Sequence, residues 1–230
     1  MPFSFFIEHD MLAEITKKDI DVCAITPEWA GVCDDIRSVF FLSRSMRKER
    51  DAWFYFTRSR VLVTFNGSTL RYLGPDERST LMLFEKALAT VAGARHSPQH
   101  EPDEPRWIES TPGVRSAGEL SRDIALGLFS KAHEKCTCYL PEFQAPMSAD
   151  PSVLALPRTL HGFLSTGTVG IVLFSPSGNA AEADATGNAT TARSPSLIKA
   201  PVIVKTSLVT HASKIMIFNL IEDNARVDGT

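Results

Sequence analysis

Six basic residues in the first third of the chain have the types and spacing to bind a phosphate backbone. They form two groups, one at the end of a predicted helix and one in a nearby turn. The six are Arg44, Arg47, Lys48, Arg50, Arg58 and Arg60. Such cations position a nucleic-acid backbone without reading its sequence. We therefore predict a nucleic-acid-binding patch here, and the alternative is a solvated basic loop without a ligand.

The cysteines do not indicate a metal centre. The chain has four, and Cys136 and Cys138 are spaced more tightly than the cysteine pairs of structural zinc sites. The sequence offers no second cysteine pair and no close histidine pair to complete such a site. We expect reduced, buried thiols and no bound metal.

The composition is that of a globular protein with one sizeable core. Of 230 residues, 43% are hydrophobic and 22% are charged, and the net charge is −3. This charge excludes a uniformly basic nucleic-acid binder but allows a local basic patch. Residues 176–198 are small and polar, so we predict a single domain over 1–230 with a flexible insertion at 176–198.

Nothing in the sequence indicates a membrane protein. It has no run of about 18 apolar residues, which a spanning helix needs. The first ten residues lack the basic region of a signal peptide and the arginine-rich character of a transit peptide. We expect an intracellular protein without a membrane partner, in the cytoplasm first and in an organelle as the alternative.

Strand and helix patterns alternate along the chain. Strands are predicted at 3–7, 52–56, 61–65, 69–73, 136–140, 169–174 and 200–205, with Asn66 and Gly67 as a turn. Helices are predicted at 30–45, from Asp76 to Gly93, at about 115–131 and at 211–222. The alternation favours an α/β fold with a mostly parallel sheet flanked by helices. Ligands of such sheets bind beyond the carboxyl ends of the strands, here after residues 140, 174 and 205.

Apolar residues mark one face of each predicted helix. These are Ile36, Val39 and Phe40; Leu81, Phe84, Leu88 and Val91; Leu120, Ile124 and Leu128; and Ile215, Phe218 and Ile221. The last helix also carries Ile217 and Leu220, which makes its apolar face wider than one sheet contact needs. We therefore expect a second partner surface on that helix.

Three stretches, taken in order, resemble the archaeal tRNA pseudouridine N1-methyltransferases, a branch of the SPOUT methyltransferases. The first is Ser38-Val-Phe-Phe-Leu-Ser-Arg44, with Arg47 following. The second is Gly74-Pro-Asp-Glu-Arg78, with its helix and then Ser110-Thr-Pro-Gly113. The third is Thr206-Ser-Leu-Val-Thr-His-Ala212 with the apolar helix that follows. Each motif is weak alone, but their order and approximate spacing match the family over nearly the whole chain.

The resemblance implies a fold, a cofactor and a reaction. The fold would be SPOUT-like, with a C-terminal trefoil knot, which is a rare exception to unthreaded chain topology. The protein would bind S-adenosylmethionine and methylate N1 of a pseudouridine in a structured RNA, either tRNA or rRNA. It would form a homodimer through the C-terminal helix, and a heterodimer with a paralogue is the alternative.

The resemblance also implies site residues. The family's carboxylate precedes its first helix in a Gly-Arg-x-Asp pattern, and the matching stretch from Pro27 to Asp35 does not keep that pattern. Asp34 or Asp35 could replace this carboxylate with a shift of register, and the alternative is that both are exposed helix charges. The implied cofactor-binding residues are Leu140, Glu142, Ser175, Gly178, Thr206, Ser207, Leu208, His211 and Ala212.

Two of the implied cofactor loops depart from the family. Phe174 and Pro176 stand where the family has a glycine-containing run, and only Gly178 keeps that pattern. The glycine expected after Glu142 is also missing. These departures support a second hypothesis, a catalytically weakened SPOUT-fold protein that binds RNA or a partner subunit, for example in ribosome assembly.

Overall fold

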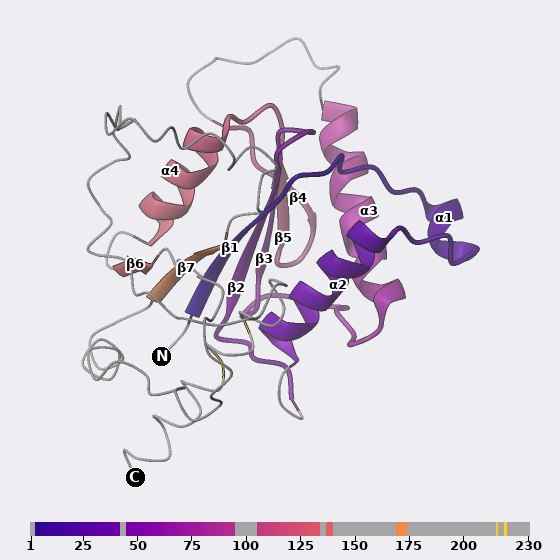
Figure 1. Cartoon of the computed structure of the whole chain (residues 1–230), viewed down its shortest axis with the longest axis horizontal. Helices are drawn as coiled ribbons and strands as arrows, with labels where there is room; N and C mark the ends of the chain where they lie inside the picture. Colours follow the sequence, from indigo (N-terminus) through magenta and orange to yellow (C-terminus); the bar gives the residue numbers. More distant parts are fainter. Residues whose placement is uncertain are drawn as a thin grey trace, which may run out of the picture.

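The computed structural model describes residues 3–41, 45–94, 105–133, 137–139 and 169–173, and also Ile215 and Asn219. These residues form an α/β fold built on one sheet of seven strands in the order β4-β5-β3-β2-β1-β7-β6 (Figure 1). The strands are β1 Phe3–His9, β2 Asp51–Phe56, β3 Val61–Asn66, β4 Ile108–Thr111, β5 Val114–Ala117, β6 Thr137–Tyr139 and β7 Val169–Leu173.

The sheet is mixed, so the prediction of a mostly parallel sheet is wrong for one half of it. Strands β2, β1, β7 and β6 pair with one another in parallel. Strands β3, β5 and β4 join by antiparallel pairing. A turn over residues 57–60 connects β2 directly to β3, and Pro112 and Gly113 form the turn between β4 and β5. Connections this short can join only antiparallel strands.

Helices cover both faces of the sheet. They are α1 Lys17–Asp21, α2 Pro27–Phe40, α3 Glu77–Ala94 and α4 Arg122–Ala132. Helices α1, α2 and α3 pack on one face, and α4 packs on the other (Figure 1). Alternate residues of β1 follow this division, because Phe5 and Ile7 join the first core and Phe6 joins the second.

Side-chain caps fix where these helices begin. The Thr26 hydroxyl accepts a hydrogen bond from the backbone N–H of Trp29, and Pro27 occupies the first position of α2. The Asp76 carboxylate accepts from the N–H of Ser79 at 2.8 Å, which confirms Asp76 as the cap of α3. The predicted helix at 30–45 therefore begins earlier, at Pro27, and α2 ends at Phe40.

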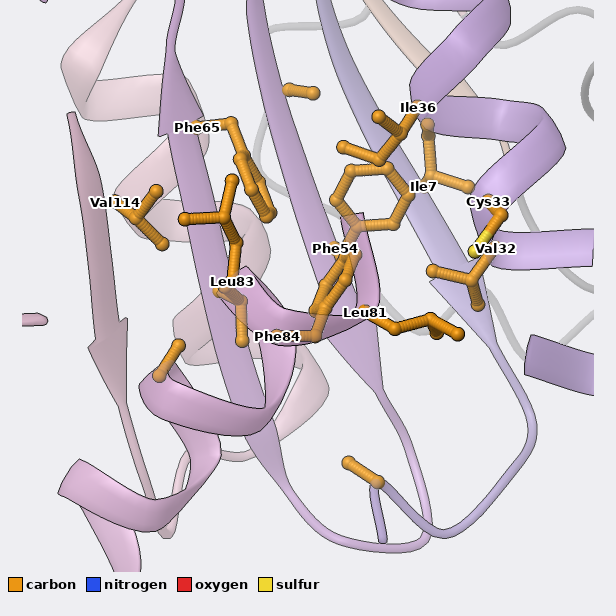
Figure 2. Close-up of a cluster of buried hydrophobic side chains, with 14 of the residues drawn as sticks. Ile7, Val32, Cys33, Ile36, Phe54, Phe65, Leu81, Leu83, Phe84 and Val114 are labelled. Atoms are coloured by element: carbon orange, nitrogen blue, oxygen red, sulfur yellow. The ribbon is translucent and has the colours of Figure 1, made fainter. Parts of the chain in front are cut away.

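The larger core is built around the ring of Phe84 from α3. Its centroid lies 4.9 Å from that of Phe65 and 5.3 Å from that of Phe54 (Figure 2). Trp29 from α2 contacts the same ring at 5.4 Å. Offset and edge-on aromatic pairs add to the free energy of area burial. This cluster therefore ties α2 and α3 to β2 and β3.

The predicted strand at 69–73 is wrong. Residues 67–69 form a turn in which the N–H of Leu70 donates to the carbonyl of Asn66. The position beside β3 is taken by β5, which pairs Val114 with Phe65. Gly113 packs directly on the backbone of Leu70. These contacts leave residues 69–73 no strand to pair with.

The predicted helix at about 115–131 begins too early. Residues Val114–Ala117 are strand β5, and α4 begins at Arg122 after a Ser121 cap. The predicted apolar face is correct in part: Leu120 is buried and Leu128 packs against the second core, but Ile124 is 50% exposed, and Ala125 and Phe129 are buried in its place. A short apolar run does not distinguish a strand from a helix by its period alone.

The C-terminal predictions lie mostly outside the described residues, including the strand at 200–205, the insertion at 176–198 and the knot. Ile215 and Asn219 are helical and fully buried, in agreement with a helix there. The Asn219 side-chain amide donates to the carbonyl of Ser38 at 2.7 Å. Ser38 lies in the last turn of α2, where carbonyls lack intrahelical partners, so this contact fastens the C-terminal helix to α2.

Gly113 and Gly31 form a matched pair for testing the turn between β4 and β5. Gly113 has φ +83°, and a Cβ there would lie 2.5 Å from Leu70 Cα. We expect Gly113→Ala to lower the free energy of unfolding by about 1–3 kcal/mol. Gly31→Ala in α2 meets nothing within 4 Å and should raise it by about 0.5–1 kcal/mol. Urea denaturation measures both, and equal stabilities would contradict the described turn.

Candidate functional site

The carboxyl ends of the parallel strands meet at one end of the sheet. β1 and β7 pair in parallel up to Ile7 and Leu173, so β1 extends two residues beyond β7, to His9. From β1 the chain proceeds to α1, α2 and β2 on one side, while β7 and β6 lie on the other. The order in which the strands are added to the sheet therefore changes direction between β1 and β7. Ligands of α/β sheets bind at the carboxyl ends of the strands at such a switch point.

His9 is the last residue of β1 at this end of the sheet. Its ring stacks on those of Phe54 and Phe56, each with a centroid distance of 6.0 Å. Phe56 is itself in contact with Trp29 from α2 at 5.6 Å. Aromatic contacts from β2 therefore hold the imidazole ring in one orientation. His9 was not among the site residues predicted from the sequence, although a histidine that ends an apolar strand was the available signal.

Asp35 reaches His9 from helix α2. Its Oδ2 atom lies 3.1 Å from Nε2 of His9. The side chain of Asp35 is 4% exposed and that of His9 is 13% exposed. A buried carboxylate is stable only beside a partner that offsets its charge. His9 and Asp35 therefore form a buried pair at the carboxyl end of β1.

The structure distinguishes the two carboxylates that the sequence left as alternatives. Asp34 is 55% exposed, and its carboxylate accepts a hydrogen bond from Arg37 at 2.9 Å one helical turn along α2. Asp35 lies on the buried face of the same helix. Of these two candidates, only Asp35 contacts the carboxyl end of β1.

A second charged pair lies at the same end of the sheet. Arg58, in the turn after β2, donates to both carboxylate oxygens of Asp10 at 3.2 and 3.3 Å. The Thr57 hydroxyl donates to the same carboxylate at 2.7 Å. These hydrogen bonds hold the pKa of Asp10 below its usual value, and the one from Arg58 has the largest effect. Asp10 is therefore a weak proton acceptor near neutral pH.

The predicted basic patch is divided between the two ends of β2. Arg47, Lys48 and Arg50 precede this strand, and Arg58 and Arg60 follow it. Six strand residues at about 3.3 Å each place the two groups roughly 20 Å apart. Arg44 lies outside the described residues. A single phosphate group cannot contact both groups at once.

All four described arginines of this set make contacts within the protein, Arg58 through its hydrogen bonds to Asp10. Arg50 is fully buried, with its guanidinium carbon 5.7 Å from the centre of the Phe5 ring, and Arg47 is also buried. Arg60 donates from Nη2 to the carbonyl of Glu119 at 3.1 Å. Lys48, Arg58 and Arg60 are the exposed members of the described set.

The residues expected to bind the cofactor cannot be placed. They are Leu140, Glu142, Ser175, Gly178, Thr206, Ser207, Leu208, His211 and Ala212, and all lie outside the described residues. The strands that lead to the first two loops are present: β7, to Leu173, lies beside β1, and β6, to Tyr139, lies beside β7. In the described ranges, no three histidine, cysteine, aspartate or glutamate side chains come together as metal ligands would.

Cys33 and Cys23 should differ sharply in reactivity. Burial raises the pKa of the Cys33 thiol to about 12, and Cys23 is exposed. At pH 8 the Cys33 thiol is far below its pKa and stays protonated, and only the thiolate reacts with alkylating agents. We expect iodoacetamide at pH 8 to modify Cys23 and to spare Cys33 until denaturant is added. Mass spectrometry of tryptic peptides measures this, and early modification of Cys33 would contradict the packing of α2.

Asp34 and Asp35 provide a matched test of the buried pair. Asp35→Ala leaves His9 without its carboxylate partner in a buried site, and we expect it to lower the free energy of unfolding by about 1–3 kcal/mol. Asp34→Ala removes an exposed ion pair and should change the free energy by about 0–1 kcal/mol. Chemical denaturation of both variants measures the difference. If both substitutions lower the free energy of unfolding by the same small amount, the His9–Asp35 contact does not stabilise the fold.

Comparison with known proteins gives partial matches of one kind. No family model matches the chain. A "tRNA (pseudouridine(54)-N(1))-methyltransferase" of Methanococcus maripaludis strain C7 is 37% identical over 100 residues, 41% of this chain and 44% of the relative. A protein with the same description from Haloarcula marismortui is 38% identical over 84 residues, 36% of this chain and 37% of the relative.

The matched region covers less than half of either protein. A third relative, from Natronomonas pharaonis, is 41% identical over 58 residues, 25% of this chain and 29% of its own length. Among the helices that the structure describes, none combines the length and apolarity that a membrane crossing requires. Over about two fifths of its length, the chain is a distant homologue of the archaeal tRNA (pseudouridine(54)-N(1))-methyltransferases.

Proposed function

We propose that the chain is an S-adenosylmethionine-dependent RNA methyltransferase that methylates N1 of a pseudouridine in a structured RNA, either tRNA or rRNA. The observation that carries this proposal is the 37% identity over 100 residues to an enzyme named for this reaction. The parallel arrangement of β1, β7 and β6 supports it, because it provides the strand ends beyond which ligands bind in α/β sheets.

The reaction makes two demands on the protein. The methyl group must lie in line between its sulfur and the acceptor nitrogen, which is a matter of positioning. The N1 atom of pseudouridine also carries a proton that must leave during transfer, so a proton acceptor has to be near it. The target base must leave its stack to reach such a site.

The remaining parts of the site are proposed from the resemblance. The segments after β6 and β7, together with residues Thr206–Ala212, would hold the cofactor. The exposed side chains of Lys48 and Arg58 are the described cations best placed to contact phosphates. We also propose a single intracellular domain with a C-terminal knot and a homodimer formed through the C-terminal helix. A heterodimer with a paralogue is the alternative to that homodimer.

Isothermal titration calorimetry with S-adenosylmethionine tests the cofactor assignment first. We expect saturable binding to the purified chain, and no detectable heat at millimolar cofactor would contradict an enzyme. The departures at Phe174 and Pro176 favour one second candidate, a SPOUT-fold protein that binds RNA without catalysis. RNA binding without cofactor binding would support that candidate.

Methyl transfer to RNA tests the substrate assignment. We expect transfer of a radiolabelled methyl group to a tRNA-like hairpin that contains pseudouridine. The matched control is the same hairpin with uridine at that position, because N1 of uridine is bonded to the ribose and has no proton to lose. Equal labelling of both hairpins would contradict methylation at N1.

A further inference from the structure

The end of β1 carries a histidine that the resemblance does not assign. We propose that His9, with Asp35 behind it, is the proton acceptor for the N1–H group of the substrate base. This role rests on the proposed function, and it would replace the role of the family carboxylate, whose pattern is not kept in the stretch from Pro27 to Asp35 at the start of α2.

The position of His9 suits a group that meets a ligand. It ends β1 two residues beyond the end of β7, at the point where strand order diverges. Its side chain is 13% exposed, and its Nε2 atom is buried against Asp35, so Nδ1 is the ring nitrogen that would take the proton. Asp35 is 4% exposed and lies behind the ring, too deeply buried to reach a substrate itself.

The ring of His9 is held in a fixed orientation, as a proton acceptor should be. It lies nearly parallel to the ring of Phe54, with an interplanar angle of 14°, and at 25° to that of Phe56. Phe56 is braced in turn by Trp29 and by Phe84, with centroid distances of 5.6 and 6.0 Å. Fixed catalytic groups avoid the cost of being ordered during the reaction.

The charge of Asp35 is placed to assist proton transfer. When an imidazole takes a proton it becomes positive, and a buried site disfavours that charge unless an opposite charge is near. The Asp35 carboxylate lies 3.1 Å from the Nε2 atom and provides that opposite charge. The pair would then hold the accepted proton as a neutral imidazolium–carboxylate unit.

Other described carboxylates near this end are less suitable. Asp10 accepts hydrogen bonds from Arg58 and Thr57, which lower its pKa. Glu8 points to the opposite face of the sheet, where it accepts a hydrogen bond from Arg122 at 2.6 Å. Asp34 is engaged by Arg37 on the surface of α2. His9 is therefore the best placed acceptor among the described residues at this end.

The proposed step balances in atoms and charge. The N1 atom gives its proton to the imidazole of His9 and uses the freed electron pair to form a bond to the methyl carbon of a sulfonium donor. The bond between that carbon and sulfur breaks, and its electron pair stays on sulfur, which becomes neutral. The proton then passes from His9 to solvent.

Two measurements on the full chain test this role. The first is NMR of histidine ring resonances without cofactor, on adding the pseudouridine hairpin. We expect the His9 signals to shift and those of His133 to stay. The second is the single-turnover rate of methyl transfer as a function of pH, with His9→Gln compared with His133→Gln. His133 is the matched control, because it is also buried beside aromatic rings, on the face of the sheet covered by α4.

The expected result is a loss specific to His9. His9→Gln should slow transfer by roughly 10²-fold or more with RNA affinity unchanged, and the dependence of its rate on pH should differ from that of the wild type. An unchanged rate or pH profile in His9→Gln would overturn the role of His9 alone. A His9→Gln chain that fails to fold leaves the NMR contact as the deciding result. No transfer by the wild type would overturn the proposed function and this role together.

Discussion

The docking of helix α2 on the parallel strands is the contact on which the candidate site depends. Val32, Ile36 and Val39 are fully buried and lie on one face of α2 at helical spacing. Burying side chains of this size contributes about 1.5–3 kcal/mol each. Asp35 lies within this apolar stripe, so the packing that secures α2 also forces a carboxylate into the core. Its partner there is His9, at the carboxyl end of β1.

Elements with a long apolar pattern were predicted from the sequence, and the shortest strands were not. The strands β1, β2 and β3 are short, mostly apolar runs, and the helices α2 and α3 repeat apolar residues at helical spacing, so each was predicted within a few residues. β4 and β5 are four residues each and too short to show a period; β4 was not predicted, and most of β5 was assigned to the start of the helix at about 115–131. β5 then took the place beside β3 that residues 69–73 had been expected to fill.

The candidate site was less predictable than the fold, because it is assembled from distant segments. Asp34 and Asp35 are adjacent in sequence, and only the orientation of α2 separates an exposed carboxylate from a buried one. Arg50 reads as a surface cation in the sequence, yet it is buried over Phe5. His9 and Asp35 are brought together by the packing of α2 on β1, and a local sequence pattern does not predict such a contact.

The distant homology and the strand arrangement are two separate lines of support for the proposed function. The relatives share less than half of their length with this chain, and they are named as enzymes that act on a pseudouridine in tRNA. In the described structure, the parallel strands have the arrangement at whose carboxyl ends ligands of α/β sheets bind. The His9–Asp35 pair lies at the carboxyl end of β1, one of these strands. The strand arrangement and the His9–Asp35 pair are consistent with a reaction in which a ring nitrogen of the substrate loses a proton.

Hydrogen-exchange mass spectrometry tests most directly whether this end of the sheet is the working site. The chain would be compared alone, with S-adenosylhomocysteine, and with a pseudouridine hairpin added. The account predicts slower exchange in the peptides that follow β1, β6 and β7. Protection absent from these peptides and confined to residues 47–50 and 67–73, at the opposite end of β2 and β3, would contradict it.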